Sequence, residues 1–343
     1  MSGSGDPAMA GHAPLVSILM PAFNAEAFLP EAIDSARRQT LEDIEILVID
    51  DASTDGTAAL VAGIGVADPR VRLVRRARNG GPSAARNQGL DEARGRWIAL
   101  LDSDDAYELD RLERLVALAG QRGADLCSDN LLLVPEDGAA PRPMIPSEIL
   151  AADRELTLAE FVRRNVADRS HPGVNFGFLK PIFRRAFLSE HRIRYDERVR
   201  FAEDFALYAD CFRAGARWWM SPAPTYRYSV RANSLTQVQT VHDLGILRDR
   251  QARWLEEARQ AGDGDLQRLV ARHKRVIDRC YHYRAFTDAV KAGRLAEALR
   301  IFTGSMRSAA CIAEESGRQA PIIALKALRG GYRRQQAAQH LHP

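Results

Sequence analysis

Four short apolar runs alternate with helix-like segments over the first hundred residues, and this alternation limits the possible folds more than any other feature. The runs cover residues 16–20, 44–50, 71–75 and 97–101. The helix-like segments between them cover residues 27–39, 57–65 and 82–95. Strands that alternate with helices at this spacing favour βαβ units and a mostly parallel sheet. The runs are continuously apolar, which is typical of strands that are covered on both faces.

The middle of the chain is less regular, and the last third has the pattern of consecutive helices. Residues 135–148 contain four prolines and are expected to form a loop over the sheet. One helix is expected to begin near Thr157, which forms a capping box with Glu160. Another is expected at residues 203–215, where a glycine ends it. From about residue 240 to residue 339, apolar side chains recur at helical spacing.

The composition is that of a soluble globular protein and excludes several other classes. Of the 343 residues, 46% are hydrophobic and 27% are charged, which is an ordinary balance. The formal net charge of +3 is too small to indicate nucleic-acid binding. The four cysteines form no Cys-x-x-Cys pair and fit free thiols in a reducing compartment.

The N-terminal region is uncharged over residues 7–25 but does not read as a targeting segment. It fails as a signal peptide because the first Lys or Arg is Arg37. It fails as a membrane span because prolines and a glycine interrupt it. Residues 1–12, rich in Ser, Gly and Ala, read as a disordered leader. These features predict a cytoplasmic protein.

Polar residues follow each of the four expected strands. The segments are PAFNAE at 21–26, DDASTDGT at 50–57, NGGPSAARN at 79–87 and DSDD at 102–105. Ligands of open α/β sheets bind at the carboxyl ends of the strands. The four segments are therefore expected to meet at one edge of the sheet and to form the functional site there.

The acidic strand ends indicate a metal and a nucleotide. A helix cap needs one Asp, so the three carboxylates of Asp102, Asp104 and Asp105 exceed that need. The spacing of Asp102 and Asp104 lets two carboxylates approach one Mg²⁺ or Mn²⁺, which could bridge a diphosphate. Capping accounts for residues 53–55, but it does not need Asp51, which suits a hydrogen bond to a base or a ribose.

The glycine-rich segment at 79–87 permits close approach of a ligand but matches no common phosphate motif. Gly80 and Gly81 allow the backbone to come near a ligand, and Arg86 could reach a phosphate. The segment is neither a P-loop, because no Gly-Lys-Ser/Thr follows, nor a Gly-x-Gly-x-x-Gly fingerprint. A dinucleotide-dependent oxidoreductase is therefore disfavoured.

These motifs together resemble the family-2 glycosyltransferases of GT-A fold. The resemblance is dense over residues 14–115 and resumes at AEDFALYADCFRAGARW, residues 202–218. It implies an α/β GT-A fold, a nucleoside-diphosphate sugar as donor (usually a UDP-sugar), and a divalent metal, Mn²⁺ or Mg²⁺. It also implies a catalytic domain over residues 13–235, with a nucleotide half to about residue 115 and an acceptor half after it. A helical C-terminal region would follow at 236–343.

The resemblance assigns roles to the residues at the strand ends. The implied nucleotide-binding residues are Pro21, Phe23, Asn24, Asp51, Asn79, Arg86, Asp102 and Ser103. Asp104 is implied to be the direct metal ligand, with Asp102 near both the ribose and the metal. Asp105 is left between a contact to the donor sugar and a cap of the next helix. His242 is either an additional metal ligand or a solvated histidine at a helix end.

The acidic pair Glu203-Asp204 resembles the catalytic pair of the family. Asp204 is implied to be the catalytic base of an inverting transfer, with Glu203 supporting the acceptor site. The alternative is that two carboxylates simply favour a helix N-terminus.

The segment at residues 225–236 also has two interpretations. Its alternating aromatic residues and arginines could suggest nucleic-acid stacking. A strand followed by a loop near the donor diphosphate is the favoured interpretation there.

Residues 177–191 and the long helical C-terminus resemble succinoglycan-type glucosyltransferases of bacterial exopolysaccharide assembly. That resemblance implies UDP-glucose, a polyprenyl-diphosphate-linked oligosaccharide acceptor and the inner face of the cytoplasmic membrane. The basic tail at 321–343 suits anionic lipid or is a solvated helix end. The alternatives are a transferase for lipopolysaccharide core or a teichoic-type polymer, and a catalytically silent GT-A binding module. The intact acidic motifs argue against a silent module.

Overall fold

The chain forms two compact units, residues 1–237 and residues 238–343. The computed structural model describes residues 13–165, 174–200, 202–231 and 240–318. Three expectations therefore lie wholly or mostly outside the described residues, namely the disordered leader at 1–12, the loop near the donor diphosphate that ends the segment 225–236, and the lipid-contacting tail at 321–343.

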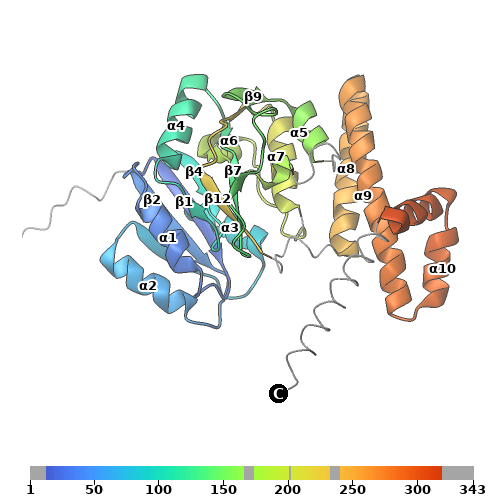
Figure 1. Ribbon diagram of the computed structural model, residues 1–343, viewed down its shortest axis with the longest axis horizontal. Helices are drawn as coiled ribbons and strands as arrows, with labels where there is room; N and C mark the ends of the chain where they lie inside the picture. Colours follow the sequence, from blue (N-terminus) through green and yellow to red (C-terminus); the bar gives the residue numbers. More distant parts are fainter. Residues whose placement is uncertain (1–12, 166–173, 201, 232–239, 319–343) are drawn as a thin grey trace, which may run out of the picture. The chain divides into compact units, whose positions relative to one another are not determined.

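An eight-stranded sheet organises the first unit, and its first four strands are those expected from the sequence (Figure 1). They are β1 (Val16–Ala22), β2 (Ile44–Asp50), β3 (Val71–Arg75) and β4 (Trp97–Leu100). All three pairings among them, β3–β2, β2–β1 and β1–β4, are parallel. Every residue of β2 and β4 is buried, as expected for strands covered on both faces.

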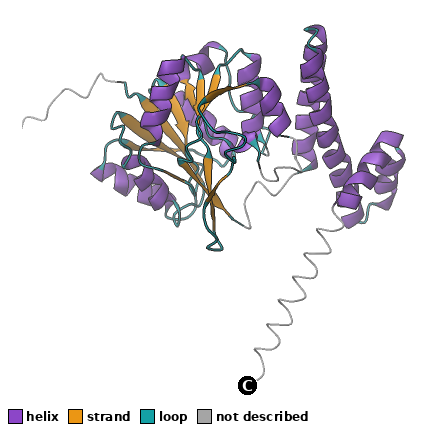
Figure 2. Ribbon diagram, turned by 45° about the horizontal axis from the view of Figure 1, so that its top comes forward, coloured by secondary structure: helices purple, strands orange, loops and turns teal. Residues whose placement is uncertain are grey.

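Three helices connect these strands and pack against them (Figure 2). They are α1 (Leu29–Arg37), α2 (Thr57–Ala67) and α3 (Pro82–Glu92). Proline stands in the first turn of α1 and of α3, where its missing N–H costs no intrahelical hydrogen bond. Because the four strands are parallel, they end at the same edge of the sheet. There β1, β2 and β3 lead into the loops before α1, α2 and α3, and β4 leads to a short strand at Ala106–Tyr107.

The sheet continues into the later chain and becomes mixed, but four of the seven strand pairings described for it are parallel, as the predicted mostly parallel sheet requires. Its order is β3-β2-β1-β4-β10-β6-β11-β9. The added strands are β6 (Leu126–Ser128), β9 (Arg154–Leu156), β10 (Ile182–Arg184) and β11 (Trp218–Met220). β10 runs antiparallel to both β4 and β6, and β9 runs antiparallel to β11. Such short strands have too little periodicity for their direction to be read from sequence.

A second sheet has four strands in the order β5-β12-β7-β8. They are β5 (Ala106–Tyr107), β7 (Leu131–Pro135), β8 (Arg142–Pro143) and β12 (Tyr226–Val230). The proline-rich stretch 135–148 is thus not a plain loop, because β8 returns antiparallel to β7 within it. The strand expected near residues 225–230 is present as β12.

The later part of this unit adds further helices, and the two that the sequence predicts, near Thr157 and from Glu203, are among them. The helices are α4 (Arg111–Arg122), α5 (Leu158–Arg164), α6 (Arg185–Glu190) and α7 (Glu203–Arg213), with the 3₁₀ helix η2 (Phe176–Phe178). Thr157 caps α5 by accepting a hydrogen bond from the Glu160 backbone N–H. The Glu160 carboxylate pairs with Arg154 instead of completing the capping box.

A buried ion pair beneath the strand ends gives a first prediction. The Arg111 side chain is fully buried, and its Nε and Nη2 each donate to Asp129 at 2.9 Å. Arg111→Met leaves the Asp129 carboxylate buried without that partner, so we expect the free energy of unfolding to fall by about 3–5 kcal/mol. Denaturant titration measures this free energy of unfolding. Arg114→Met, which removes an exposed pair with Asp110, should change it by less than about 1 kcal/mol. Equal effects of the two variants would contradict the prediction.

The second unit is helical over its described residues. It contains α8 (Val241–Gln260), α9 (Gly264–Lys291) and α10 (Leu295–Thr303), and residues 306–318 are also helical. Thr240 and Asp263 cap α8 and α9 with their side chains. Within residues 13–165, 174–200, 202–231 and 240–318, no helix is both long enough and apolar enough to cross a bilayer.

Candidate active site

The loop after β1 is tied to the loop after β2 by Asn24. Asn24 adopts a left-handed backbone conformation, with φ of 50°. Its backbone N–H donates to Ser53 Oγ at 2.9 Å, and its side-chain Oδ1 accepts from the Thr54 N–H at 2.9 Å. Pro21 is the sixth residue of β1, and the neighbouring Phe23 is 50% exposed. Phe23 therefore exposes an aromatic ring at this edge of the sheet, whereas the Asn24 side chain is used in a hydrogen bond to the neighbouring loop.

The loop between β3 and α3 wraps around Asp51. The buried Asp51 carboxylate accepts from the backbone N–H groups of Gly80 and Gly81, the latter at 2.7 Å, and pairs with Arg76. Gly81 has a φ of 85°, which favours glycine. Asn79 Nδ2 donates to the Asp51 backbone carbonyl at 3.2 Å. The close backbone approach expected of the two glycines is thus made to Asp51 itself.

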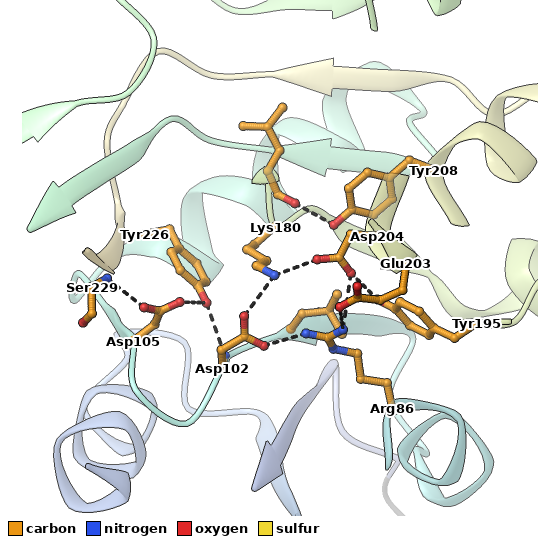
Figure 3. Close-up of polar contacts among 12 residues, drawn as sticks. Arg86, Asp102, Asp105, Lys180, Tyr195, Glu203, Asp204, Tyr208, Tyr226 and Ser229 are labelled. Carbon is orange, nitrogen blue, oxygen red and sulfur yellow. Dashed lines mark hydrogen bonds and ion pairs between the residues drawn. The ribbon is translucent and has the colours of Figure 1, made fainter. Parts of the chain in front are cut away.

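Arg86 lies on α3 between carboxylates that come from distant parts of the chain (Figure 3). Its side chain is 4% exposed. Nη2 donates to Asp102 Oδ1 at 2.8 Å, and Nη1 donates to Glu203 Oε1 at 2.9 Å. Nη1 also lies 3.5 Å from Asp204 Oδ1. In this state the guanidinium binds protein carboxylates, whereas the sequence suggested a phosphate.

The three acidic residues after β4 have different surroundings. Both Asp102 oxygens are paired, one with Arg86 and one with Lys180 at 3.0 Å. Burial alone would raise the pKa of Asp102, but these two cations outweigh it and hold that pKa well below its usual range. Asp104 is more open, with a side chain 40% exposed and 3.8 Å from Arg231. Ser103 lies between the two, half-buried.

Asp105 is a structural tie between the β4 loop and β12. Tyr226 Oη donates to Asp105 Oδ2 at 2.7 Å, and the Ser229 N–H donates to Oδ1 at 2.8 Å. The next helix, α4, is preceded by Asp110, so the prediction that Asp105 caps that helix is wrong. Burial, with the charges of Asp102 and Asp104, raises the pKa of Asp105 well above its usual range.

The pair Glu203-Asp204 opens α7 and lies near Asp102, with which it shares Arg86 and Lys180. Lys180 Nζ donates to Asp204 Oδ2 at 2.8 Å, and Tyr195 Oη donates to Asp204 Oδ1 at 3.1 Å. Burial and the neighbouring charge of Asp204 raise the pKa of Glu203. Arg86 and Lys180 thus bring Asp102 together with Glu203 and Asp204, although about a hundred residues separate them in sequence.

A family profile and two similar proteins identify the family of this chain. The sequence profile described as Glycosyl transferase family 2 matches residues 17–188. "Succinoglycan biosynthesis protein ExoO" of Rhizobium meliloti is 39% identical over 287 residues, which cover 84% of this chain and 80% of that protein. The chain belongs to glycosyl transferase family 2. ExoU of the same organism, also named a succinoglycan biosynthesis protein, is 34% identical over 80% of this chain and 78% of that protein.

Solved structures similar to this family-2 glycosyltransferase support the GT-A fold. TarS of S. aureus, residues 1–349 in complex with UDP-GlcNAc, matches with a TM-score of 0.61 and 19% identity over 89% of this chain and 92% of that one. The mannosyltransferase PcManGT of Pyrobaculum calidifontis, in complex with GDP-Man and Mn²⁺, matches with a TM-score of 0.52 and 17% identity, over 90% and 81% of the two chains. At such identities the likeness concerns the fold.

The acidic residues of this glycosyltransferase fit a divalent metal through Asp104. Its side chain is 40% exposed, and burial with the charge of Asp102 raises the pKa of Asp104. Among the residues that the structure describes, no three His, Cys, Asp or Glu side chains gather into a metal-binding group. Mg²⁺ is often held by one or two carboxylates, with phosphate and water completing its shell. His242 is exposed in the first turn of α8, in the second unit.

Lys180 is the site residue that sequence reasoning missed. It precedes β10 and its side chain is 5% exposed. Burial alone would lower the pKa of Lys180, but the charges of Asp102 and Asp204 raise it above its ordinary value. One signal was available, because only four of the 48 basic residues in the chain are lysines. Tyr195 and Tyr226, which hold Asp204 and Asp105, carried no comparable signal.

Proposed function

We propose that this family-2 glycosyltransferase moves a sugar from a UDP-sugar to a hydroxyl group of its acceptor, with inversion at the anomeric carbon. The observation that carries the proposal is the meeting of Asp102 with Glu203 and Asp204 around Arg86 and Lys180. A donor-side carboxylate and a candidate base thereby share one site. The proposed halves are residues 13–115 for the nucleotide and 116–235 for the acceptor.

The proposed reaction is a single displacement. Asp204 removes the proton of the acceptor hydroxyl while the hydroxyl oxygen attacks the anomeric carbon. The bond from that carbon to the diphosphate oxygen breaks, and UDP leaves from the opposite face. Glu203 supports the acceptor beside Asp204. A divalent metal held by Asp104 (with Asp102 nearby) would supply positive charge to the leaving diphosphate.

The proposed nucleotide site is the set of loops at the carboxyl ends of β1, β2 and β4. Phe23 would lie beside the base, with Pro21 and Asn24 shaping its loop, and Ser103 beside the ribose. Hydrogen bonds already join Asp51 to Asn79 and Gly80 in the loop between β3 and α3. Asp51 and Asn79 would therefore either contact the uracil after a rearrangement of this loop or hold the loop in place. Arg86 would act through Asp102 on the ribose side.

The proposed acceptor is a lipid-linked oligosaccharide of exopolysaccharide biosynthesis, with UDP-glucose as the favoured donor. The names of ExoO and ExoU, both succinoglycan biosynthesis proteins, support this choice. A different cell-surface polymer is the second candidate. It is favoured by TuaG of Bacillus subtilis, named a putative teichuronic acid biosynthesis glycosyltransferase, which is 34% identical over 36% of this chain.

A donor screen tests this function. Purified protein is incubated with a panel of UDP-sugars and Mn²⁺ or Mg²⁺, and the released UDP is measured with and without lipid-linked oligosaccharide. We expect release with one donor in preference to the others, and stimulation by the acceptor. If no UDP-sugar is turned over and UDP with Mn²⁺ gives no thermal stabilisation, the transferase proposal fails and a binding module is favoured.

We also propose that the protein works at the inner face of the cytoplasmic membrane and contacts it through the second unit. Leu295, Leu299 and Phe302 of α10 form what we call the α10 stripe; they are 68%, 62% and 40% exposed. Basic residues are close to the stripe in sequence, namely Lys291, Arg294, Arg300 and Arg307, of which Arg294 pairs with Glu297 and Arg307 with Asp278. An exposed apolar stripe with basic residues close in sequence suits a surface of anionic lipid.

Vesicle binding tests the α10 stripe. Each buried Leu or Phe side chain contributes about 1.5–3 kcal/mol, so the double variant Leu299→Asp with Phe302→Asp should bind anionic phospholipid vesicles at least about tenfold more weakly than the wild type. Val66→Asp, which alters a 90% exposed residue of the first unit, should bind as the wild type does. If the wild type does not bind such vesicles but forms a dimer that the double variant abolishes, the stripe joins two copies of the chain.

A further inference from the structure

Lys180 is a buried ammonium placed between a donor-side carboxylate and the candidate base. Its Nζ lies 2.8 Å from Asp204 Oδ2 and 3.0 Å from Asp102 Oδ2. Figure 3 shows it between these two side chains, with Tyr195 on the far side of Asp204. Lys180 stands two residues before β10, and β10 pairs with β4, the strand that leads to Asp102. The backbone therefore fixes the starting points of both Lys180 and Asp102.

Arg86 closes this arrangement into a ring of charges. Starting at Asp102, the ring passes through Arg86 to Asp204 and returns through Lys180. Asp204 is closer to Lys180 Nζ, at 2.8 Å, than to Arg86 Nη1, at 3.5 Å. Lys180 is thus the nearer cation to Asp204, whereas at Asp102 Arg86 (2.8 Å) and Lys180 (3.0 Å) are about equally close.

We propose that Lys180 is a positioning residue, which holds the Asp204 carboxylate in the orientation needed for transfer and keeps it at a set distance from the donor-side Asp102. This inference rests on the proposed function of the site. Lys180 acts through Asp204 and takes no part in bond making. A compact ammonium suits the task, because one nitrogen can donate to two carboxylates at once, whereas a planar guanidinium spreads its donors over a fork.

A merely structural role makes different predictions from a positioning role. If Lys180 only neutralises buried charge, an arginine should replace it, and a folded variant should turn over at the wild-type rate. If Lys180 sets the orientation of Asp204, even a charge-conserving change should slow the chemical step. Small misplacement of a reacting group can cost about 10²-fold in rate. Binding of the nucleotide, at the other side of Asp102, should change much less.

The experiment compares Lys180→Met and Lys180→Arg with the wild type in the UDP-release assay. Thermal unfolding and UDP binding first verify that each variant is folded. We expect Lys180→Met to lower kcat by about 10²-fold and Lys180→Arg by about tenfold, while the donor KM stays within about threefold of the wild type. Methylammonium should restore part of the kcat of Lys180→Ala, because it can occupy the vacated place of the Nζ.

The matched control is Lys274→Met in the second unit. Lys274 Nζ lies 2.8 Å and 3.0 Å from the two oxygens of Asp278, so the change also removes a lysine–carboxylate pair. It should leave kcat and KM unchanged.

The outcomes separate this inference from the function on which it rests. A wild-type protein that turns over no donor overturns the proposed function and the inference with it. An active wild type, together with a Lys180→Met variant of unchanged kcat, overturns the inference alone. If Lys180→Met does not fold, Lys180→Arg decides, and a wild-type kcat in that variant overturns the positioning role.

Discussion

Asp204→Asn is expected to lower the rate of sugar transfer by about 10²–10⁴-fold, which is the usual contribution of a positioned base. Asparagine keeps the shape of the side chain and can still accept the hydrogen bond from Lys180, but it cannot take up a proton. The binding of UDP should remain, because the proposed nucleotide loops lie at the ends of β1, β2 and β4. Transfer kinetics and UDP titration on the same preparation measure the two effects.

Two further variants sharpen this test. Asp210→Asn changes the same residue type on the same helix, away from the ring of charges, and should leave transfer unchanged. Glu203→Gln should reduce transfer less than Asp204→Asn if Glu203 only supports the acceptor. Loss of UDP binding in Asp204→Asn would make Asp204 a structural residue, and full activity would place the base elsewhere.

Asp104→Ala is expected to abolish the stabilisation of the protein by UDP that depends on Mn²⁺. The variant should also lower transfer by about 10²–10³-fold, since charge supplied by a metal to a leaving group is worth several kcal/mol. Asp104 suits this test better than Asp102, because removal of Asp102 would also break the pairs with Arg86 and Lys180. The increase in melting temperature caused by UDP is measured with Mn²⁺ and again with a chelator. The difference between the two values reports metal binding.

The control for the metal is Asp34→Ala, an exposed carboxylate on α1 that pairs with Arg37. It should keep both the metal-dependent shift and the rate. If Asp104→Ala retains the Mn²⁺-dependent shift, the metal is not held through Asp104. If the wild type has full activity in chelator, the reaction needs no divalent metal.

The parallel core and the position of the site could be predicted because they follow from local patterns. The four apolar runs are long enough to show their strand character, and the loops after parallel strands must meet at one edge of the sheet. Asp102 and Asp104 were therefore identifiable as candidates, whereas the pair Glu203-Asp204 was suggested by the resemblance to the family. The Thr157 cap was visible for the same reason, since capping depends on residues three positions apart.

The contacts that join the two halves of the site could not be read from the sequence. Lys180 acts on Asp102 and Asp204 across gaps of 78 and 24 residues, and no local pattern records such a meeting. Asp105 was misassigned in part because its partners, Tyr226 and Ser229, lie more than a hundred residues away. The antiparallel strand β10 has three residues, too few for periodicity to reveal its direction.

The place of β10 in the sheet has a consequence for protein engineering. Because β10 pairs with β4 on one side and β6 on the other, an exchange of modules at residue 115 between related enzymes would replace one partner of a shared ladder. Such a chimera would also have to rebuild the hydrogen bond from Arg185 Nε to the Gly95 carbonyl. A crossover near residue 237, where one compact unit ends, leaves the ladder whole. Donor preference should therefore be changed by substituting individual side chains within residues 13–237. The helical unit can instead be exchanged as a whole.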